Sequence, residues 1–199
     1  KKTSNYLERR KDIEKFNQNN DFLKRGIALT PVKFGISFNA SFLNQAGALL
    51  HIYNDGSVYL NHGGTEMGQG LNTKIAQVVA NEFQLPLDKI KITATSTGKV
   101  PNTSATAASS GTDLNGMAAK NAAEKIKLRM AEYLAAEAQI KPDQVAFENG
   151  KVSVGVNEYD FSDAVMRCYM GRISLSATGF YSTPKVHWDP KTLKGRPFY

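Results

Sequence analysis

The stretch GALLHIYNDGSVYLNHGG, residues 47–64, constrains the fold more than any other part of the sequence. Two apolar runs flank Asn54, Asp55 and Gly56, three residue types that tolerate the positive φ angles of tight turns. Runs of this length on either side of such a turn predict a β-hairpin. The fold must therefore accommodate an antiparallel strand pair at this point of the chain.

The hairpin leads into HGGTEMGQGLNTK, residues 62–74, where four glycines precede a run of apolar residues. The apolar residues from Leu71 to Phe83 have helical spacing, which predicts a helix. The backbone amides of residues 67–71 would lie at its N-terminus, where an anionic or acceptor-rich group can bind. Gln69 adds a side chain that both donates and accepts hydrogen bonds. The alternative is a tight strand-to-helix connection with Gln69 exposed to water.

A second loop, STGKVPNTSATAASSGTDLNG, residues 96–116, consists mostly of small and hydroxyl residues. It leads into a long helix expected from about Thr112 to Gln139, rich in Ala, Lys, Glu and Leu. Two loops that each begin a helix can converge on one polar ligand. The alternative is a Ser/Thr-rich N-cap with a flexible loop. The residues alone thus predict binding of a phosphate-bearing or heterocyclic cofactor.

Helical and strand patterns alternate along the chain without a strict βαβ repeat, which predicts an α+β or mixed α/β fold. We expect β-hairpins and short strands packed with two long helices. The other expected elements begin with a helix over residues 3–25 that ends before Gly26, and a strand over 26–42 that Pro31 and Gly35 interrupt. They continue with a short strand over 86–93, two strands around 149–150, a helix at 161–170 and an extended stretch over 173–184.

The net charge of +7 over 199 residues raises the possibility of a polyanion partner. Much of the excess lies near the two ends of the chain, where solvated charge runs are common. The alternative function is a stand-alone basic module that binds RNA or another polyanion, using terminal Lys and Arg with exposed Tyr6, Tyr53 and Tyr59. The apolar share of 41% is that of a folded protein.

Protein-ligated metal and nucleophilic catalysis are not expected from this sequence. His51, His62 and His187 are far apart, and Cys168 has no CxxC partner. The GxSxG, Walker and GxGxxG patterns are absent. A single cysteine fits a reducing compartment, and no signal peptide or membrane-length apolar run is present. We expect a cytoplasmic piece of a longer protein.

Several long motifs occur together in one order: KRGIALTPVKFGISF, FLNQAGALLHIYNDGSVYLNHGGTEMGQGLNTK, STGKVPNTSATAASSGTDLNG and SLSATGFYSTP. In these motifs the chain resembles the molybdopterin-binding domain of the xanthine dehydrogenase and xanthine oxidase family of molybdenum hydroxylases. The resemblance covers nearly the whole chain and implies that residues 1–199 are a fragment of that domain.

The resemblance implies a molybdenum-molybdopterin cofactor whose metal is held by the pterin dithiolene, so that no protein ligand to the metal is needed. It places Gln69 near the metal end and Ala108 close to the metal. The other cofactor contacts that it implies are Gly68, Ala107, Ser109 and Ser110.

On the substrate side, the resemblance implies that Phe38 is one of two aromatic residues that sandwich a purine, worth about 1 kcal/mol beyond area burial. The next position is commonly Thr in the family and is Asn39 here, which can still form a hydrogen bond. The family's general-base glutamate and its second aromatic residue belong to segments outside this chain, and Glu66 and Glu148 do not lie in the matching motif. We therefore expect no catalytic residue within the chain and no activity from it alone.

The family oxidises hypoxanthine and xanthine to urate and passes the electrons on through 2Fe-2S clusters and FAD. The implied partners are the remainder of the molybdenum-binding subunit and an iron-sulfur/FAD subunit or domain, with no nucleic acid and no membrane. Surfaces that meet missing neighbours would be apolar and exposed, so self-association of the fragment is expected.

Overall fold

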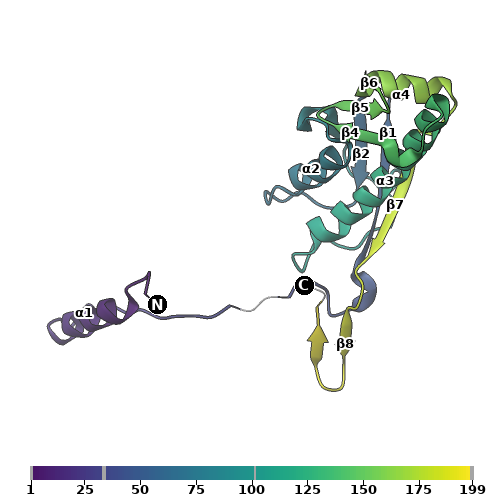
Figure 1. Cartoon of the computed structure of the whole chain (residues 1–199). Coiled ribbons are helices and arrows are strands. Elements are labelled where there is room, and N and C mark those ends of the chain that lie inside the picture. The colour runs from purple at the N-terminus through teal and green to yellow at the C-terminus, as the bar shows by residue number, and fades with distance from the viewer. Residues whose placement is uncertain (1, 33–34, 101, 198–199) are drawn as a thin grey trace. The chain divides into compact units, whose positions relative to one another are not determined.

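The computed structural model describes residues 2–32, 35–100 and 102–197. The chain divides into two compact units, residues 1–34 and residues 35–199. Helices and strands alternate through the second unit (Figure 1), which confirms the mixed fold class expected from the sequence.

The first unit contains one helix, α1 (Tyr6–Gln18), none of whose residues is buried. The helix is shorter at both ends than the sequence predicts. Asn19 Nδ2 donates to the Lys15 carbonyl at 3.2 Å, and Asn20 Nδ2 donates to the Phe16 carbonyl at 2.9 Å. Short polar side chains that bond to the nearby backbone favour helix ends over helix interiors. The asparagines therefore end the helix well before the glycine at which the sequence prediction placed its end.

The prediction of a strand over residues 26–42 is wrong. No strand forms in the described residues of that segment, which ends in a single 3-10 turn, η1 (Ser41–Leu43). Pro31 lacks a backbone donor and Gly35 has no side chain to pack, so the β-branched residues near them, Ile27, Thr30, Val32 and Ile36, do not sustain a ladder.

The hairpin prediction is confirmed by β1 (Gln45–Ile52) and β2 (Val58–His62), which pair antiparallel. At the turn, Asp55 Oδ1 accepts hydrogen bonds from the Ser57 hydroxyl at 2.6 Å and from the Ser57 amide at 2.9 Å. These two bonds lower the pKa of Asp55. Gly56 adopts a φ of 79°, as the turn chemistry requires.

The hairpin forms the centre of a four-stranded sheet with the order β3-β2-β1-β7. The edge strand β3 (Ile90–Ile92) runs parallel to β2. The other edge strand, β7 (Ser176–Ser182), runs antiparallel to β1. Both edge strands lie within segments that the sequence predicted to be extended.

Two helices, α2 (Leu71–Phe83) and α3 (Gly111–Ala138), pack against this sheet and against each other. The closest approach is between α3 and β7, where a Cβ added to Gly179 would lie 1.9 Å from the Ala118 carbonyl oxygen. The side of α3 at this crossing carries small, fully buried residues: Ala118, Ala119, Ala122 and Ala123. Small residues on both elements therefore fix the position of α3 on the sheet.

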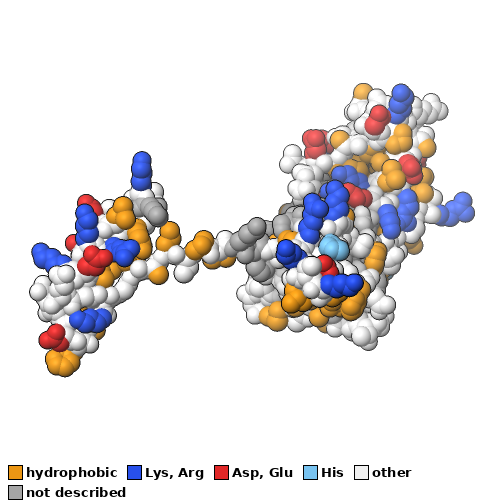
Figure 2. Space-filling view, turned by 90° about the horizontal axis from the view of Figure 1, so that it is seen from below, with side chains coloured by type: hydrophobic (Ala, Val, Ile, Leu, Met, Phe, Trp, Pro, Cys, Tyr) orange, Lys and Arg blue, Asp and Glu red, His pale blue; other side chains and the backbone are white. Residues whose placement is uncertain are grey.

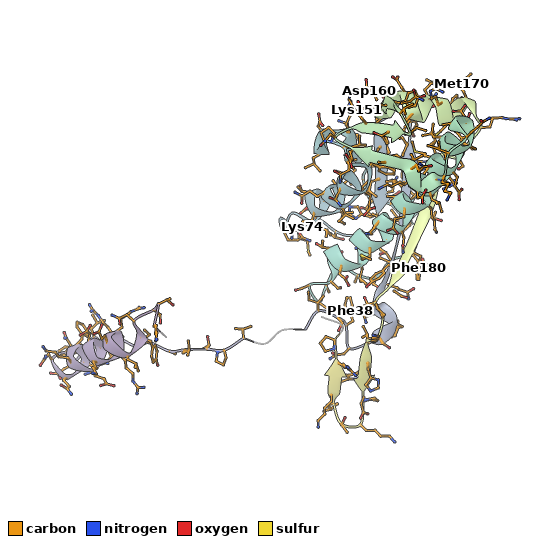
Figure 3. All side chains as sticks on the ribbon, viewed as in Figure 1. Phe38, Lys74, Lys151, Asp160, Met170 and Phe180 are labelled. Atoms are coloured by element: carbon orange, nitrogen blue, oxygen red, sulfur yellow. The ribbon has the colours of Figure 1, made fainter. Side chains whose placement is uncertain are left out.

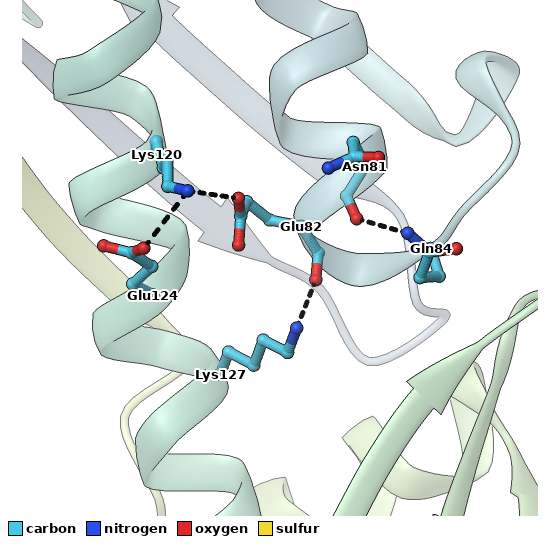
Figure 4. Close-up of polar contacts among 6 residues, drawn as sticks. All are labelled: Asn81, Glu82, Gln84, Lys120, Glu124 and Lys127. Atoms are coloured by element: carbon cyan, nitrogen blue, oxygen red, sulfur yellow. Dashed lines mark hydrogen bonds and ion pairs between the residues drawn. The ribbon is translucent and has the colours of Figure 1, made fainter.

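Polar contacts join the end of α2 to the middle of α3 (Figure 4). Lys127 Nζ donates to the Glu82 carbonyl at 2.8 Å. Lys120 Nζ lies 3.1 Å from Glu82 Oε1 and 3.5 Å from Glu124 Oε1. A cation at the last carbonyls of a helix is favoured by the helix dipole, so these lysines hold the C-terminal end of α2 against α3.

A second, three-stranded sheet has the order β4-β5-β6 and consists of β4 (Val145–Glu148), β5 (Lys151–Val154) and β6 (Asn157–Asp160). The sequence predicted the first two strands but not the third. Helix α4 (Phe161–Met170) follows directly. The Phe83 ring lies 6.4 Å from the Phe147 ring and 5.7 Å from the Phe161 ring, so aromatic contacts join this layer to α2.

A further hairpin, β8 (His187–Asp189) with β9 (Lys194–Arg196), was not predicted either. Figure 2 shows basic side chains on both units, interspersed with acidic ones around α1, where Arg10 pairs with Glu14 at 3.3 Å. None of the helices in the described part of the chain is both long and apolar enough to cross a membrane.

Candidate functional site

The loops that begin α2 and α3 lie against each other. The Thr65 amide donates to Thr106 Oγ1 at 2.8 Å across a separation of 41 residues. A Cβ added to Gly63 would lie 1.9 Å from Thr103 Cγ2, so Gly63 allows the backbone of one loop to approach the other. The structure thus confirms that the two small-residue loops meet.

A cavity of about 360 Å³ opens between these loops. Three of the residues singled out from the sequence, Gln69, Ala107 and Ser109, lie in its wall. Gly68, Ala108 and Ser110 belong to the same loops but do not line it. The complete lining consists of Met67, Gln69, Leu71, Lys74, Thr106, Ala107, Ser109, Gly111 and Thr112.

The Glu66 carboxylate binds the backbone amides of the loop before α2, residues 63–70, a role that the sequence analysis missed. Its Oε1 accepts from the amides of Gly68 at 2.9 Å and Gly70 at 3.0 Å, and its Oε2 accepts from the Asn72 amide at 3.0 Å. The Asn72, Gly70 and Gly68 amides together lower the pKa of Glu66. A carboxylate so close to a helix N-terminus is the available signal in the sequence.

The expectation that the amides of residues 67–71 are available to a ligand is therefore wrong for most of this group. Glu66 already occupies the Gly68 and Gly70 amides, and the Met67 amide donates to Gln69 Oε1 at 2.6 Å. Most of the backbone amides at the start of α2 are thus bound by the chain's own side chains.

Gln69 is held by its own loop. Besides accepting from Met67, the side chain donates from Nε2 to the Thr65 carbonyl at 2.9 Å. A primary amide has one further donor hydrogen and one further acceptor position. Gln69 therefore reaches the cavity in a fixed orientation with hydrogen-bonding capacity left over.

The loop before α3, residues 103–110, has strained backbone angles and leaves amides of the helix start unbound. Ala108 and Ser109 both adopt a φ of 55°, a conformation that costs non-glycine residues of order 1 kcal/mol or more each. Ser110 is buried and donates its hydroxyl to the Ala107 carbonyl at 2.9 Å, so it does not cap the helix. Within the described residues, the Gly111 amide finds no hydrogen-bond acceptor in the protein, nor does that of Thr112.

The buried side chain of His62 holds the loop before α2 in place. Its Nδ1 accepts from the Gly64 amide at 3.1 Å, and its side chain is buried. Burial lowers the pKa of His62, although the Asn72 side chain and the charge of Glu66 act in the opposite direction. A neutral imidazole with a buried Nε2 is suited to holding the glycine backbone in place.

The substrate residues implied by the resemblance, Phe38 and Asn39, line a different cavity of about 210 Å³. Its other wall comes from the β8–β9 hairpin and includes His187, Trp188 and Arg196. Figure 3 shows Phe38 beside this hairpin and Lys74 at the start of α2. The two cavities share no lining residue, so the predicted cofactor and substrate residues lie at two separate places on the structure.

Neither a metal cluster nor a reactive thiol is found in the described parts of the chain. No three His, Cys, Asp or Glu residues there are grouped so that they could hold a metal ion. Cys168 is fully buried, and burial raises its pKa to about 12. The thiol is therefore protonated at neutral pH and acts as a packing residue.

A layer of helices on a sheet, with two helix starts meeting around one cavity, is an arrangement that can hold a ligand between loops. The chain belongs to the molybdopterin cofactor-binding domain family, whose model matches residues 1–199.

Named relatives point in the same direction. The chain is 50% identical to a xanthine dehydrogenase of Calliphora vicina over 94% of its length, and 48% identical to one of Oryza sativa subsp. japonica over 100%. It spans only 12% and 13% of these two proteins.

Solved structures share the fold. A reconstituted CO dehydrogenase from Oligotropha carboxidovorans matches 70% of this chain, and 18% of its own chain, with a TM-score of 0.64 at 25% identity. Quinoline 2-oxidoreductase from Pseudomonas putida 86 matches 76% of this chain, and 22% of its own, with a TM-score of 0.65 at 21% identity.

Proposed function

We propose that this chain forms part of the wall around the molybdopterin cofactor, and one side of the substrate pocket, in an enzyme that oxidises hypoxanthine and xanthine to urate. The observation that carries the proposal is the cavity shared by the two helix starts, with the free amides of Gly111 and Thr112 at the start of α3. The naming of 45–50% identical relatives as xanthine dehydrogenases supports the substrate class.

The chemistry of the cavity fits the cofactor. Its lining includes Lys74, three residues with hydroxyl groups, and Gly111 and Thr112 with their free amides, and no Asp or Glu is among the lining residues. These donors, set among apolar side chains, suit a heterocyclic ligand that bears a phosphate. The bound cofactor supplies a redox-active metal held by its own dithiolene sulfurs, which agrees with a wall that offers polar contacts to the ligand.

Within this proposal the predicted residues have distinct roles. Gln69 orients the cofactor through its remaining donor and acceptor, and Ala107 and Ser109 contact it directly. Gly68 and Ala108 shape their loops through positive φ angles of 96° and 55°. The buried Ser110 hydroxyl donates to the Ala107 carbonyl and so fixes the position of Ala107.

On the substrate side, Phe38 provides a stacking face for the purine, and Asn39 provides a hydrogen bond at the position that is commonly Thr. Neither cavity is lined by a carboxylate among the described residues. The general base of the reaction is therefore assigned to the remainder of the enzyme, and the chain alone is expected to be inactive.

The proposed partners are the remainder of the molybdenum-binding subunit and an iron-sulfur/FAD subunit or domain, with self-association of the isolated chain through its exposed apolar side chains. The cytoplasm remains the proposed location. We prefer this function to a polyanion-binding module because the cavity and the family agree, and because Tyr53 and Tyr59 pack edge to face, with ring centroids 4.9 Å apart.

The test is Gln69→Ala in the enzyme that contains this chain, with Gln77→Ala as the matched control on the exposed face of α2. Loss of hydrogen bonds worth about 1 kcal/mol is expected to lower molybdenum and pterin content by roughly fivefold at limiting cofactor. Metal analysis and pterin fluorescence measure this directly. Equal cofactor content and equal activity in the two variants would remove the role assigned to Gln69.

A further inference from the structure

A buried asparagine, Asn44, holds the turn that presents Phe38. Its Oδ1 accepts from the Phe38 amide at 2.8 Å, and its Nδ2 donates to the Phe38 carbonyl at 3.1 Å and to the Ser41 carbonyl at 3.0 Å. Asn44 is only 3% exposed. The side chain thus makes three of the four hydrogen bonds available to an asparagine, and two of them hold the backbone of one residue from both sides.

Asn44 is itself anchored to the central sheet. Its carbonyl accepts from the Thr183 amide at 3.0 Å, and the next residue, Gln45, begins β1 opposite Ser182 of β7. Within the described part of the chain, the bonds to Asn44 are the only hydrogen bonds made by the Phe38 backbone. The position of Phe38 therefore depends on a side chain that is fixed to the sheet six residues later in the sequence.

Phe38 lies in a segment with little regular structure of its own. Between it and Asn44 the chain forms only the 3-10 turn η1. A ring on such a segment would lose conformational freedom when a ligand stacked on it, and that loss would weaken binding. Two bonds to a buried amide restrict the Phe38 backbone before the ligand arrives, and packing against the core restricts its side chain.

We propose that Asn44 is a positioning residue that fixes the Phe38 ring as a ready-made stacking surface for a planar heterocycle. The inference rests on the proposed function, in which Phe38 contacts the purine. It adds a residue that touches neither substrate nor cofactor and acts only through the Phe38 backbone.

Asn61 offers a matched control for the removal of a buried asparagine. It is 6% exposed on β2 and accepts a hydrogen bond from the Thr93 hydroxyl, and no bond joins it to Phe38. A purely structural role for Asn44 would make Asn44→Ala and Asn61→Ala behave alike. Asn44→Asp is the second variant, because it keeps the size of the side chain and one acceptor but loses both donated bonds.

The first experiment is amide hydrogen exchange on the 199-residue chain. Asn44→Ala is expected to speed exchange of the Phe38 amide by roughly tenfold, since its acceptor is lost, while Asn61→Ala leaves it at the wild-type rate. Asn44→Asp is expected to retain part of the protection. Wild-type exchange of the Phe38 amide in Asn44→Ala would overturn the inference without touching the proposed function.

The second experiment measures steady-state kinetics with xanthine in the enzyme that contains this chain. Asn44→Ala is expected to raise KM by roughly fivefold with kcat little changed, because stacking is uniform binding energy. Phe38→Ala is expected to do at least the same, and the double variant to add nothing further, because Asn44 acts through Phe38.

The outcomes separate the two claims. A raised KM in Phe38→Ala with a wild-type KM in Asn44→Ala, or full additivity of the two changes, overturns the positioning role alone. A wild-type KM in both variants overturns the role of Phe38 in the proposed function and the inference with it.

Discussion

The starts of α2 and α3 lie side by side, but they differ in the hydrogen bonding of their backbone amides and in their φ angles. At α2 the carboxylate of Glu66 binds the free amides, and glycines with φ of 96° and 76° take up the unusual backbone angles. At α3 two non-glycine residues, Ala108 and Ser109, carry the positive φ angles, and the amides of Gly111 and Thr112 bond to no acceptor among the described residues. The side chains of the loop before α2 thus bind most of its own amides, whereas the loop before α3 keeps both strain and unbound donors.

The two loops contribute to the wall of one cavity in different ways. A loop that satisfies itself provides a rigid frame, here for Gln69. A loop with free amides provides binding energy, because these amides have no acceptor in the protein and can donate to the ligand. The three changes below alter one loop at a time, from the largest expected effect to the smallest.

Glu66→Gln should have the largest effect, because it removes the charge that three amides share and turns one acceptor into a donor. The lowered pKa of Glu66 means that its contribution is present at neutral pH and is lost as the pH falls through that value. The difference in thermal midpoint between wild type and variant should therefore be present at pH 7 and disappear as the pH falls below the lowered pKa of Glu66. Thermal unfolding followed by circular dichroism across this range measures it.

Glu132→Gln is the control, since Glu132 is an exposed carboxylate in the middle of α3. It loses the same charge without any amide partner and should remain close to wild type at each pH. A Glu66→Gln variant that tracked this control would show that the carboxylate does not organise the α2 loop.

Gly68→Ala tests the glycine side of the comparison. A Cβ at Gly68 would meet nothing within 4 Å, so the cost arises from the φ of 96° alone and should be about 1–2 kcal/mol of unfolding free energy. Gly98→Ala is the matched control, because that position also has open space but no positive φ. Urea denaturation measures both, and equal stabilities would refute a strained requirement at Gly68.

Ala108→Gly should have the smallest effect and the opposite sign. Glycine accepts a φ of 55° without steric cost, so relief of strain should outweigh the added chain entropy and stabilise the fold by about 0.5–1 kcal/mol. Ala118→Gly, inside α3, should instead destabilise it by about 1 kcal/mol. A destabilised Ala108→Gly variant would mean that the α3 loop stores no strain.

The features that were predictable from sequence depend on neighbouring residues. The hairpin follows from Asn54 to Gly56, α2 follows from apolar spacing, and α3 follows from its content of Ala, Lys, Glu and Leu. The meeting of the two loops was anticipated from their composition and position before helices. What failed depends on competition or on distant partners: the early end of α1 at the asparagines, the strand expected over residues 26–42, and the unpredicted β8–β9 hairpin.

The candidate site shows the same limit. The sequence marks Gln69 and the small residues of 107–110. It does not show that the Glu66 carboxylate accepts hydrogen bonds from the amides two, four and six residues later in the chain. Nor does it show that Ser110 turns inward while Ser109 faces the cavity. These outcomes are decided by backbone angles that no spacing rule encodes.

The contact between Gly179 and Ala118 makes one residue of β7 a limit on how close α3 can lie to the sheet. A Cβ added to Gly179 would lie 1.9 Å from the Ala118 carbonyl oxygen and 2.6 Å from the Ala122 amide nitrogen. A side chain at this position would therefore push α3 away from β7. Because Gly111 begins the same helix and lines the cavity, the absence of a side chain in β7 helps to set the position of the cavity wall.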